Sequence, residues 1–306
     1  MQTVTGGEVA PTAIDKSECF IQNEGVCATA QIVDEMHRFL KKEHSIDLPK
    51  NPKELVKTMK NVLGVDTEAE ILQHRDFSKY IGTREAQREL EENFKEKGPN
   101  DSTALLDNFN IDGTLHKWAK HSQKLFKKIK GKYGNAEGGA TELGKKFYHI
   151  PFQMIDFQKV GSELSRISIP DLIKGGYDCF GCVLNTDVSS GGGKHWFCIY
   201  GDLEHSGAEN DPFVIEFFNS SGNPPVREVN LWMENTCADI MKTLKLHAVT
   251  LRAAPKRLQY SQTECGMWSL MYIKSRLENK DPKYFYNANA DDKDMIKFRE
   301  YMFRGA

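Results

Sequence analysis

Hydrophobic residues recur at helical spacing along the first hundred positions of the chain. A helix is predicted over 28–42, where four apolar side chains share one face: Ile32, Met36, Phe39 and Leu40. A second helix is predicted after Asn51, a favourable N-cap, and ends at Gly64. A third extends from about Thr83 to Lys97, before a Gly-Pro pair. This charged region has few β-branched runs and therefore predicts a helical arm domain over residues 1–100.

Beyond residue 100 the pattern first stays helical and then becomes strand-like. Asp112 is a candidate cap for a helix with an apolar face on one side and lysines on the other. Short apolar or aromatic runs predict strands at 180–185, 194–200, 213–219 and 247–252. Periodic segments predict helices at 228–245, 263–278 and 292–303. Strands with helices before and after them indicate an α+β core over residues 101–306.

Composition narrows the classes of protein without selecting one. The chain has 306 residues, 39 % of them hydrophobic, enough for one large domain or two ordinary ones. A formal net charge of -2 argues neither for nor against a nucleic-acid partner. No apolar run reaches the ~20 residues of a membrane span, and we expect no secretory signal. Seven scattered cysteines, an odd number, favour reduced thiols in a cytosol-like compartment.

Three segments of the core carry residues typical of thiol chemistry. His195 begins a predicted strand, directly after a run of glycines that lets backbone or substrate come close. Asn219 ends the next predicted strand, and Cys265 begins a predicted helix. The positive end of a helix favours a thiolate, His195 is a suitable proton acceptor, and an amide oxygen can hold the imidazole in one tautomer. The residues alone leave open a buried structural cysteine and an ordinary strand histidine.

Several residues near these three in the sequence are candidates for supporting roles. Gln262 precedes Cys265 by three residues, so its amide and the Cys265 backbone N–H are candidates for an oxyanion hole. The acids Glu216 and Asp211 are alternatives to Asn219 as the third partner. Gly266 leaves room beside the nucleophile. Other cysteines have simpler interpretations: Cys179 and Cys182 form a CxxC that lacks a second pair for zinc and enters a strand, and Cys198 is expected in the core.

These segments resemble one family of proteases. FGCVLNTD, GGGKHWFCIY, FFNSSGN and SQTECGMWSLMYIKSRL are similar, in this order, to segments of the African swine fever virus polyprotein-processing protease, to which adenovirus endopeptidase and the SUMO-specific proteases are related. NFNIDGTLHKWA and MIKFREYMFR extend the resemblance over most of 100–306, whereas over 1–100 only the helical, charged character is shared. By this resemblance the chain is expected to be a homologue of that protease from a related large DNA virus.

The resemblance implies a fold and a reaction. The expected fold is a papain-like, adenovirus-protease-like core with a central mixed sheet flanked by helices, preceded by the helical arm. By position His195 is the base, Cys265 the nucleophile, Asn219 the third member, which is Asp in the SUMO proteases, and Gln262 the oxyanion glutamine. The expected function is an endopeptidase that cleaves viral structural polyproteins after Gly-Gly during virion maturation. No metal or organic cofactor is needed for this reaction.

Substrate recognition is expected close to the nucleophile and the base. Gly193, Trp196 and Gly266 are candidate substrate-binding residues, and a narrow passage that admits backbone but no side chains explains a Gly-Gly preference. One alternative is a protease for ubiquitin-like modifiers, which also end in Gly-Gly. A different class of alternative is a catalytically silent scaffold of the virus particle.

Some features depart from the family pattern or point to further partners. Residues 124–146 and 203–211 are expected insertions, and the second is a candidate to alter substrate access; Met267-Trp268 is bulkier than expected after the nucleophile. The lysine-rich face of Lys117–Lys130 is a candidate site for DNA or an acidic partner. Gly138-Gly139-Ala140 and Gly6-Gly7-Glu8 are candidate self-cleavage sites. The expected location is the viral assembly sites of the host cytoplasm, and the virus particle.

Overall fold

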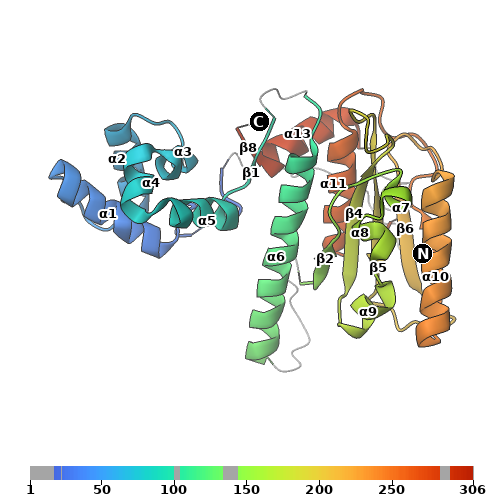
Figure 1. Ribbon diagram of the computed structural model, residues 1–306. Coiled ribbons are helices and arrows are strands. Elements are labelled where there is room, and N and C mark those ends of the chain that lie inside the picture. The colour runs from blue at the N-terminus through green and yellow to red at the C-terminus, as the bar shows by residue number, and fades with distance from the viewer. Residues whose placement is uncertain (1–16, 22, 100–103, 134–143, 283–289, 306) are drawn as a thin grey trace, which may run out of the picture. The chain divides into compact units, whose positions relative to one another are not determined.

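A computed structural model of the chain describes residues 17–21, 23–99, 104–133, 144–282 and 290–305, without the side chains of 123–133 (Figure 1). The chain divides into two compact units. The core unit contains residues 101–299, and the arm unit contains residues 14–100 together with 300–306. The C-terminal residues from Glu300 onward therefore group with the arm, whereas the sequence pattern assigns them to the core.

The arm unit is helical, and its helices follow the expected apolar periodicity. They are α1 (Ala30–His44), α2 (Pro52–Leu63), α3 (Glu68–Gln73), α4 (Arg75–Ile81) and α5 (Thr83–Asn93). The Thr29 and Asn51 side chains cap α1 and α2, and Gly64 ends α2 in the left-handed region. The last helix is shorter than predicted, because the chain leaves it to form β1 (Glu96–Lys97), which pairs in parallel with β8 (Phe303–Arg304).

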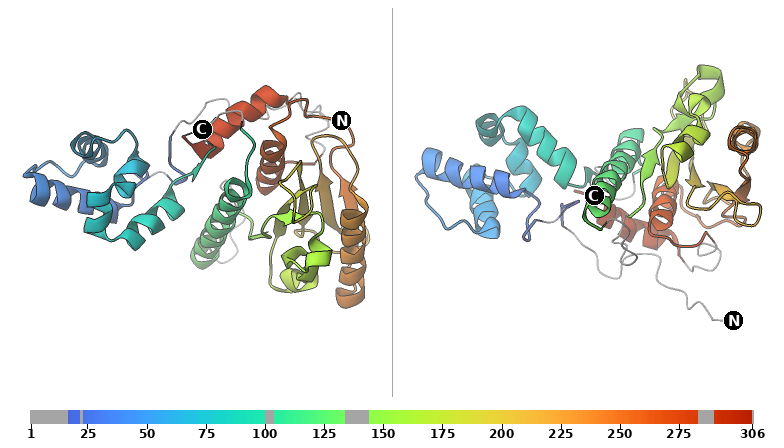
Figure 2. Two further views of the ribbon diagram at one scale, coloured as in Figure 1. Left: turned by 45° about the horizontal axis from the view of Figure 1, so that its top comes forward. Right: turned by 90° about the horizontal axis from the view of Figure 1, so that it is seen from below.

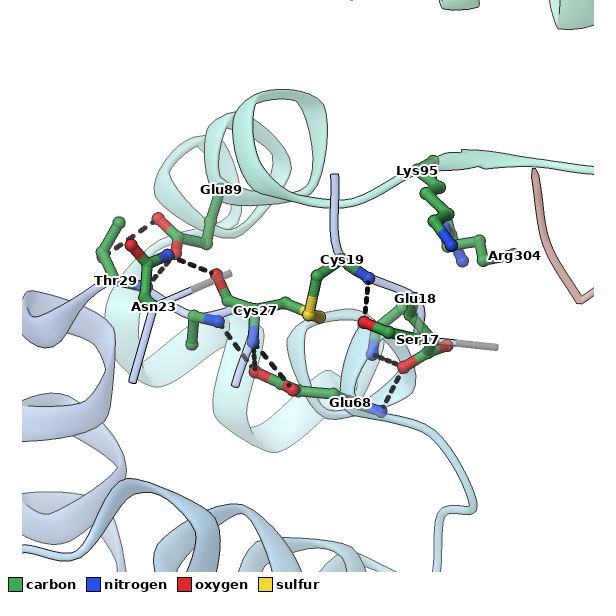
Figure 3. Close-up of a disulfide and its surroundings, with 12 residues drawn as sticks. Ser17, Glu18, Cys19, Asn23, Cys27, Thr29, Glu68, Glu89, Lys95 and Arg304 are labelled. Atoms are coloured by element: carbon green, nitrogen blue, oxygen red, sulfur yellow. Dashed lines mark hydrogen bonds between the residues drawn. A yellow bond between two sulfur atoms is a disulfide. The ribbon is translucent and has the colours of Figure 1, made fainter. Parts of the chain in front are cut away.

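A disulfide in the arm corrects the expectation that all thiols are reduced. Cys19 and Cys27 are bonded, with Cα atoms 4.8 Å apart, across a turn closed by the backbone pair Asn23–Val26 (Figure 3). The Glu68 carboxylate accepts hydrogen bonds from the N–H groups of Cys27 and Ala28. The odd cysteine count hid this pair, because five further cysteines are unbonded.

The core unit is built on one mixed sheet. Its strands are β2 (Phe147–His149), β3 (Gln153–Met154), β4 (Cys179–Asn185), β5 (Trp196–Asp202), β6 (Phe213–Phe218) and β7 (Ala248–Arg252). Their order is β2-β4-β5-β6-β7, and β3 also pairs with β4. The pairs β4–β5 and β5–β6 are antiparallel, whereas β2, β3 and β7 join in parallel. The expected α+β class with a mixed sheet is confirmed.

Helices cover both faces of this sheet (Figures 1 and 2). The helices of this part of the chain are α6 (Asn108–Tyr133), α7 (Phe157–Val160), α8 (Glu163–Arg166), α9 (Ile169–Lys174), α10 (Arg227–Leu244) and α11 (Cys265–Leu277), and α13 (Asp292–Met302) follows them. On one face Trp232 of α10 packs edge-on against Phe180 of β4. On the other, Tyr272 of α11 stacks on Phe218 of β6, with ring centroids 4.4 Å apart. All seven residues of β5 are buried, which explains its continuous apolar run.

Two expectations for α6 need correction. The helix begins at Asn108 and not after Asp112, because Asp107 and Asn110 cap it reciprocally through their side chains and backbone N–H groups. Asp112 lies inside the helix, where its carboxylate accepts a bond from the Phe152 N–H. Lys117, assigned to an exposed lysine face, is only 7 % exposed.

The remaining lysine side chains of that face beyond residue 122 lie outside the described side chains, and so does most of the expected insertion at 124–146. The two candidate self-cleavage sites, at Gly6-Gly7 and Gly138-Gly139, also fall outside the described residues. In the part of the chain that the structure describes, no helix is long and apolar enough to cross a membrane.

Candidate active site

The three residues of the predicted triad lie at the ends of secondary-structure elements, which the fold brings together at one end of the central strands. His195 directly precedes β5 and Asn219 directly follows β6. These strands are antiparallel, with Cys198 opposite Phe218, so the start of β5 meets the end of β6. Cys265 is the first residue of α11, which packs against β5.

A hydrogen bond joins His195 and Asn219 and defines the tautomer of the imidazole. His195 Nε2 lies 2.8 Å from Asn219 Oδ1. The same Oδ1 accepts bonds from the backbone N–H and the hydroxyl of Ser221, at 3.0 and 2.8 Å. Because the Ser221 N–H can only donate, the atom it contacts is the amide oxygen, and His195 Nε2 must carry the proton. Nδ1 is then the basic nitrogen of the ring.

Cys265 is almost fully buried, and its surroundings affect the thiol in opposite directions. Burial is the larger effect and raises the pKa of Cys265 above its ordinary value, while the backbone N–H groups of Trp196 and Gly266 lower it. The Trp196 N–H directly follows His195, so the sulfur lies against the segment that carries the imidazole. The helix start is expected to favour a thiolate, and the burial of Cys265 opposes that effect by raising the pKa of the thiol.

The two acids considered as alternatives to Asn219 are engaged elsewhere. Glu216 is 1 % exposed and pairs with Arg276 on α11. Burial raises the pKa of Glu216, opposed by the Arg276 charge. Asp211 accepts bonds from the Ser206 N–H and from His205, which lower the pKa of Asp211 to about 2. Among the described residues the carboxamide of Asn219 is therefore the group hydrogen-bonded to the His195 imidazole.

The loop before His195 is folded around two polar side chains that the sequence analysis did not single out. Asn185 Oδ1 accepts bonds from the N–H groups of Asp187 and Lys194, both at 2.9 Å. The Asp187 carboxylate accepts the Gly193 N–H at 3.1 Å. Gly193 has φ of +89°, in the left-handed region that favours glycine. The glycine run thus shapes the loop that delivers His195, and an Asn-x-Asp before a Gly-rich run was its only signal in the sequence.

A groove of about 490 Å³ adjoins the loop, and the residues on both sides of His195 line it. Its walls include Leu105, Leu106, Phe152, Met154, Gly193 and Trp196. The Trp196 indole is fixed there, because its Nε1–H donates to the Leu106 carbonyl at 3.0 Å and Phe152 packs edge-on against it. Two of the three candidate substrate-binding residues, Gly193 and Trp196, thus line one groove.

The third candidate, Gly266, lies in a different setting. It is buried, and a Cβ on Gly266 would come within 3.1 Å of the Leu106 Cβ. The space beside this glycine is therefore filled by Leu106 and not open to substrate. Gln262 is exposed, in the segment between β7 and α11. An oxyanion donor has to be preorganised, so the role proposed for Gln262 requires that its backbone be held in place.

The other features noted in the sequence lie away from this edge or inside the core. The segment 203–211 follows the far end of β5, about seven residues or ~23 Å along the strand from His195. Met267 and Trp268 are fully buried. Cys179, Cys182 and Cys198 are unbonded and buried, and burial raises the pKa of Cys179 to about 12. These three buried thiols are expected to be unreactive as nucleophiles.

Comparison with known proteins covers nearly the whole chain. No protein-family model matches it. Two curated relatives are the SUMO-1 cysteine protease of African swine fever virus isolate Tick/South Africa/Pretoriuskop Pr4/1996 and the corresponding cysteine protease of strain Badajoz 1971 Vero-adapted. Each is 35% identical over 308 aligned positions, which span 94% of this chain and 95% of the relative.

A solved structure agrees with these relatives. The crystal structure of the African swine fever virus protease superposes with a TM-score of 0.70 and 31% identity, over 96% of this chain and 98% of that one. The likeness therefore includes the arm, where the sequence motifs had indicated only a shared helical character.

Proposed function

Because the chain belongs to the family of the African swine fever virus SUMO-1 cysteine protease, we propose that it is an endopeptidase that cleaves viral structural polyproteins after Gly-Gly. The chain is a cysteine protease, as its relatives are, and this identity argues against a silent scaffold. The proposal concerns the residue roles, the substrate and the setting. The observation that carries it is the 2.8 Å bond from His195 Nε2 to Asn219 Oδ1, at the strand edge where Cys265 begins α11.

The first half of the reaction transfers the acyl group of the substrate to sulfur. His195 Nδ1 takes the proton of the Cys265 thiol as the sulfur attacks the carbonyl carbon of the second glycine. The Cys265 backbone N–H and the Gln262 side-chain amide stabilise the oxyanion. The imidazolium then gives its proton to the departing amine, the C–N bond breaks, and a thioester remains on Cys265.

The second half releases the acid product. His195 takes a proton from a water molecule, whose oxygen attacks the thioester carbonyl, and the thiol leaves with the proton that the imidazolium returns. Asn219 keeps Nε2 protonated throughout, because its oxygen is held by Ser221. The raised pKa of Cys265 is compatible with this mechanism, because His195 removes the thiol proton when substrate is present.

A Gly-Gly preference is supported by the walls of the groove beside His195. The rim at Gly191, Gly192 and Gly193 consists of backbone, so an extended peptide can lie close to it. The Trp196 indole also lines the groove and is held in place at both its nitrogen and its ring. A groove lined by a fixed aromatic ring and by glycine backbone favours residues without a side chain.

A second candidate substrate is a ubiquitin-like modifier with a Gly-Gly end. The observation that favours it is the name of a relative, SUMO-1 cysteine protease. Both substrates require the same chemistry and differ in whether a folded domain precedes the glycines. We place the activity at viral assembly sites and in the virus particle. A DNA or acidic partner for the lysine-rich segment 117–130 is a weaker proposal, since Lys117 is buried.

The test is a comparison of substrates. Purified protein and Cys265→Ala are incubated with peptides of the form X-X-Gly-Gly-Ala-X, and in parallel with SUMO-1 extended by the same Ala-X sequence; products are read by mass spectrometry. We expect cleavage of the peptides after the second glycine, by the unmodified protein alone. Faster cleavage of the modifier than of the peptides supports the second candidate. Cleavage at other bonds, or cleavage by Cys265→Ala, contradicts the proposal.

A further inference from the structure

The segment that carries the nucleophile is held by side chains of α13. Asp292, the first residue of this helix, accepts hydrogen bonds on Oδ2 from the N–H groups of Tyr260 and Ser261, at 2.8 and 2.6 Å. Its Oδ1 accepts the indole N–H of Trp268 at 3.0 Å. One carboxylate thus joins the residue before Gln262 to the first turn of α11.

A second contact holds the other side of the segment. Arg299, two helical turns further along α13, donates from Nη2 to both carboxylate oxygens of Glu264, at 3.1 and 3.0 Å. Its Nη1 donates to the Ala104 carbonyl at 2.8 Å. The side chains of Arg299 and Glu264 are 0% and 2% exposed, so this ion pair is dry. Glu264 directly precedes Cys265, and it turns away from the start of α11 instead of capping it.

The buried charge of Glu264 matters to the neighbouring sulfur. Burial is the largest effect that raises the pKa of Cys265, and the Glu264 charge raises it further. Two other titratable groups come from elements near Cys265. His195 directly precedes β5, and Asp292 is the first residue of α13. Arg299 is the cation paired with Glu264, so its removal would leave a carboxylate uncompensated beside the developing thiolate.

We propose that Arg299 and Asp292 are positioning residues of the active site: Arg299 orients and neutralises Glu264 beside the nucleophile, and Asp292 fixes the backbone that presents Gln262. This inference rests on the proposed roles of Cys265 and Gln262. It assigns to α13 a task in catalysis as well as in packing. The two residues act through different neighbours, so their loss should affect different steps.

The experiment compares Arg299→Met and Asp292→Ala with Lys297→Met. Lys297 is an exposed residue of the same helix and forms a salt bridge with Asp294. Circular dichroism reports folding, hydrolysis of a Gly-Gly-Ala peptide gives kcat and KM, and the pH dependence of iodoacetamide labelling at Cys265 gives the thiol midpoint. We expect Arg299→Met to lower kcat about tenfold or more and raise the midpoint by about one pH unit, with KM within about twofold.

Two further variants separate charge from structure. The double variant Glu264→Gln with Arg299→Met removes both charges, and its midpoint should return to that of the unmodified protein. Asp292→Ala should lower kcat without moving the midpoint, because it acts on the Gln262 side. Lys297→Met should change neither quantity. Should Arg299→Met fail to fold, Arg299→Lys replaces it, with an expected loss in kcat at an unchanged midpoint.

The outcome decides between this inference and the proposed function. A folded Arg299→Met, or its Arg299→Lys substitute, with unaltered kcat and midpoint overturns the role of Arg299, and a folded Asp292→Ala with unaltered kcat overturns that of Asp292. Cys265→Ala is measured alongside: an inactive Cys265→Ala with fully active α13 variants refutes this inference alone. An active Cys265→Ala refutes the proposed function instead.

Discussion

His195 Nε2 and Asn219 Oδ1 lie 2.8 Å apart, although 24 positions separate the two residues in the sequence. The antiparallel pairing of β5 and β6 brings them together, and Ser221 fixes the direction of the amide. The imidazole is therefore oriented by backbone geometry before any substrate binds. Substitutions of Asn219 and Ser221 can therefore measure how much each hydrogen bond contributes to activity.

Replacement of Asn219 tests the orientation of the imidazole. Asn219→Ala removes the acceptor of the Nε2 proton, so kcat/KM should fall about 10²-fold or more. Asn219→Asp keeps an acceptor at the same place and should retain most of the activity. Ser221→Ala is the matched control: the backbone N–H bond survives, and the loss should stay within about threefold. Peptide hydrolysis measures all three, and equal activity of the Ala and Asp variants would contradict the role of Asn219.

The reactivity of Cys265 should depend on pH with a definite sign. Burial raises the pKa of this thiol, so the protonated form persists through neutral pH and the thiolate appears as the pH rises further. Iodoacetamide should label Cys265 slowly at about pH 6 and increasingly fast above about pH 9. Peptide mapping after timed labelling gives the rates. A rate at mildly acidic pH equal to the alkaline rate would reveal a preformed thiolate and contradict this prediction.

Two adjacent glycines provide a matched test of the loop before His195. Gly193 has φ of +89°, so Gly193→Ala strains the backbone by about 1–2 kcal/mol and should displace His195. A Cβ added at Gly192 would meet no atom within 4 Å, so Gly192→Ala should be tolerated. Thermal unfolding and peptide hydrolysis of both variants are the measurements. An equal loss of activity in Gly192→Ala and Gly193→Ala would contradict this prediction. It would indicate that the groove requires small residues at both positions, and that the left-handed backbone of Gly193 is not the cause.

The disulfide of the arm predicts a redox-dependent stability. Breaking the Cys19–Cys27 bond, which closes a loop over a separation of 8 residues, should lower the stability of the arm by about 2–3 kcal/mol. The double variant Cys19→Ser with Cys27→Ser should unfold at a lower temperature, and reducing agent should no longer shift its transition. Cys237→Ser, at an unbonded and half-buried cysteine, is the control and should still respond to reductant. A response to reductant that persists in the double variant would disprove this assignment.

The sequence was sufficient to predict features that depend on local patterns. The cap at Asn51, the stop at Gly64 and the aromatic runs of β5 and β6 each follow from neighbouring residues, and they were found as predicted. The start of α6 was missed, because Asp107 and Asn110 cap it earlier than Asp112. Both residue types are common caps, and propensity does not choose between them.

Features that depend on contacts between residues far apart in the chain could not be predicted from the sequence. Arg299 and Glu264 are 35 positions apart, and in the sequence Arg299 is one more charged residue of an amphipathic helix. The burial of Cys265 was missed for the same reason: the helix start is visible in the sequence, whereas the packing around the sulfur is not. The bond between Cys19 and Cys27 closes over a turn that Asn23 and Gly25 favour, but a turn signal alone does not show that the two flanking cysteines are oxidised.

The most direct measurement of the central claim is covalent capture of the nucleophile. The protein is incubated with a peptide that ends in Gly-Gly vinyl sulfone, and the adduct is located by intact mass and peptide mapping, alongside His195→Ala. We predict a single adduct on Cys265 that forms far more slowly in His195→Ala. An adduct on another cysteine, or equal rates with and without His195, would contradict the assignment of Cys265 and His195 as nucleophile and base.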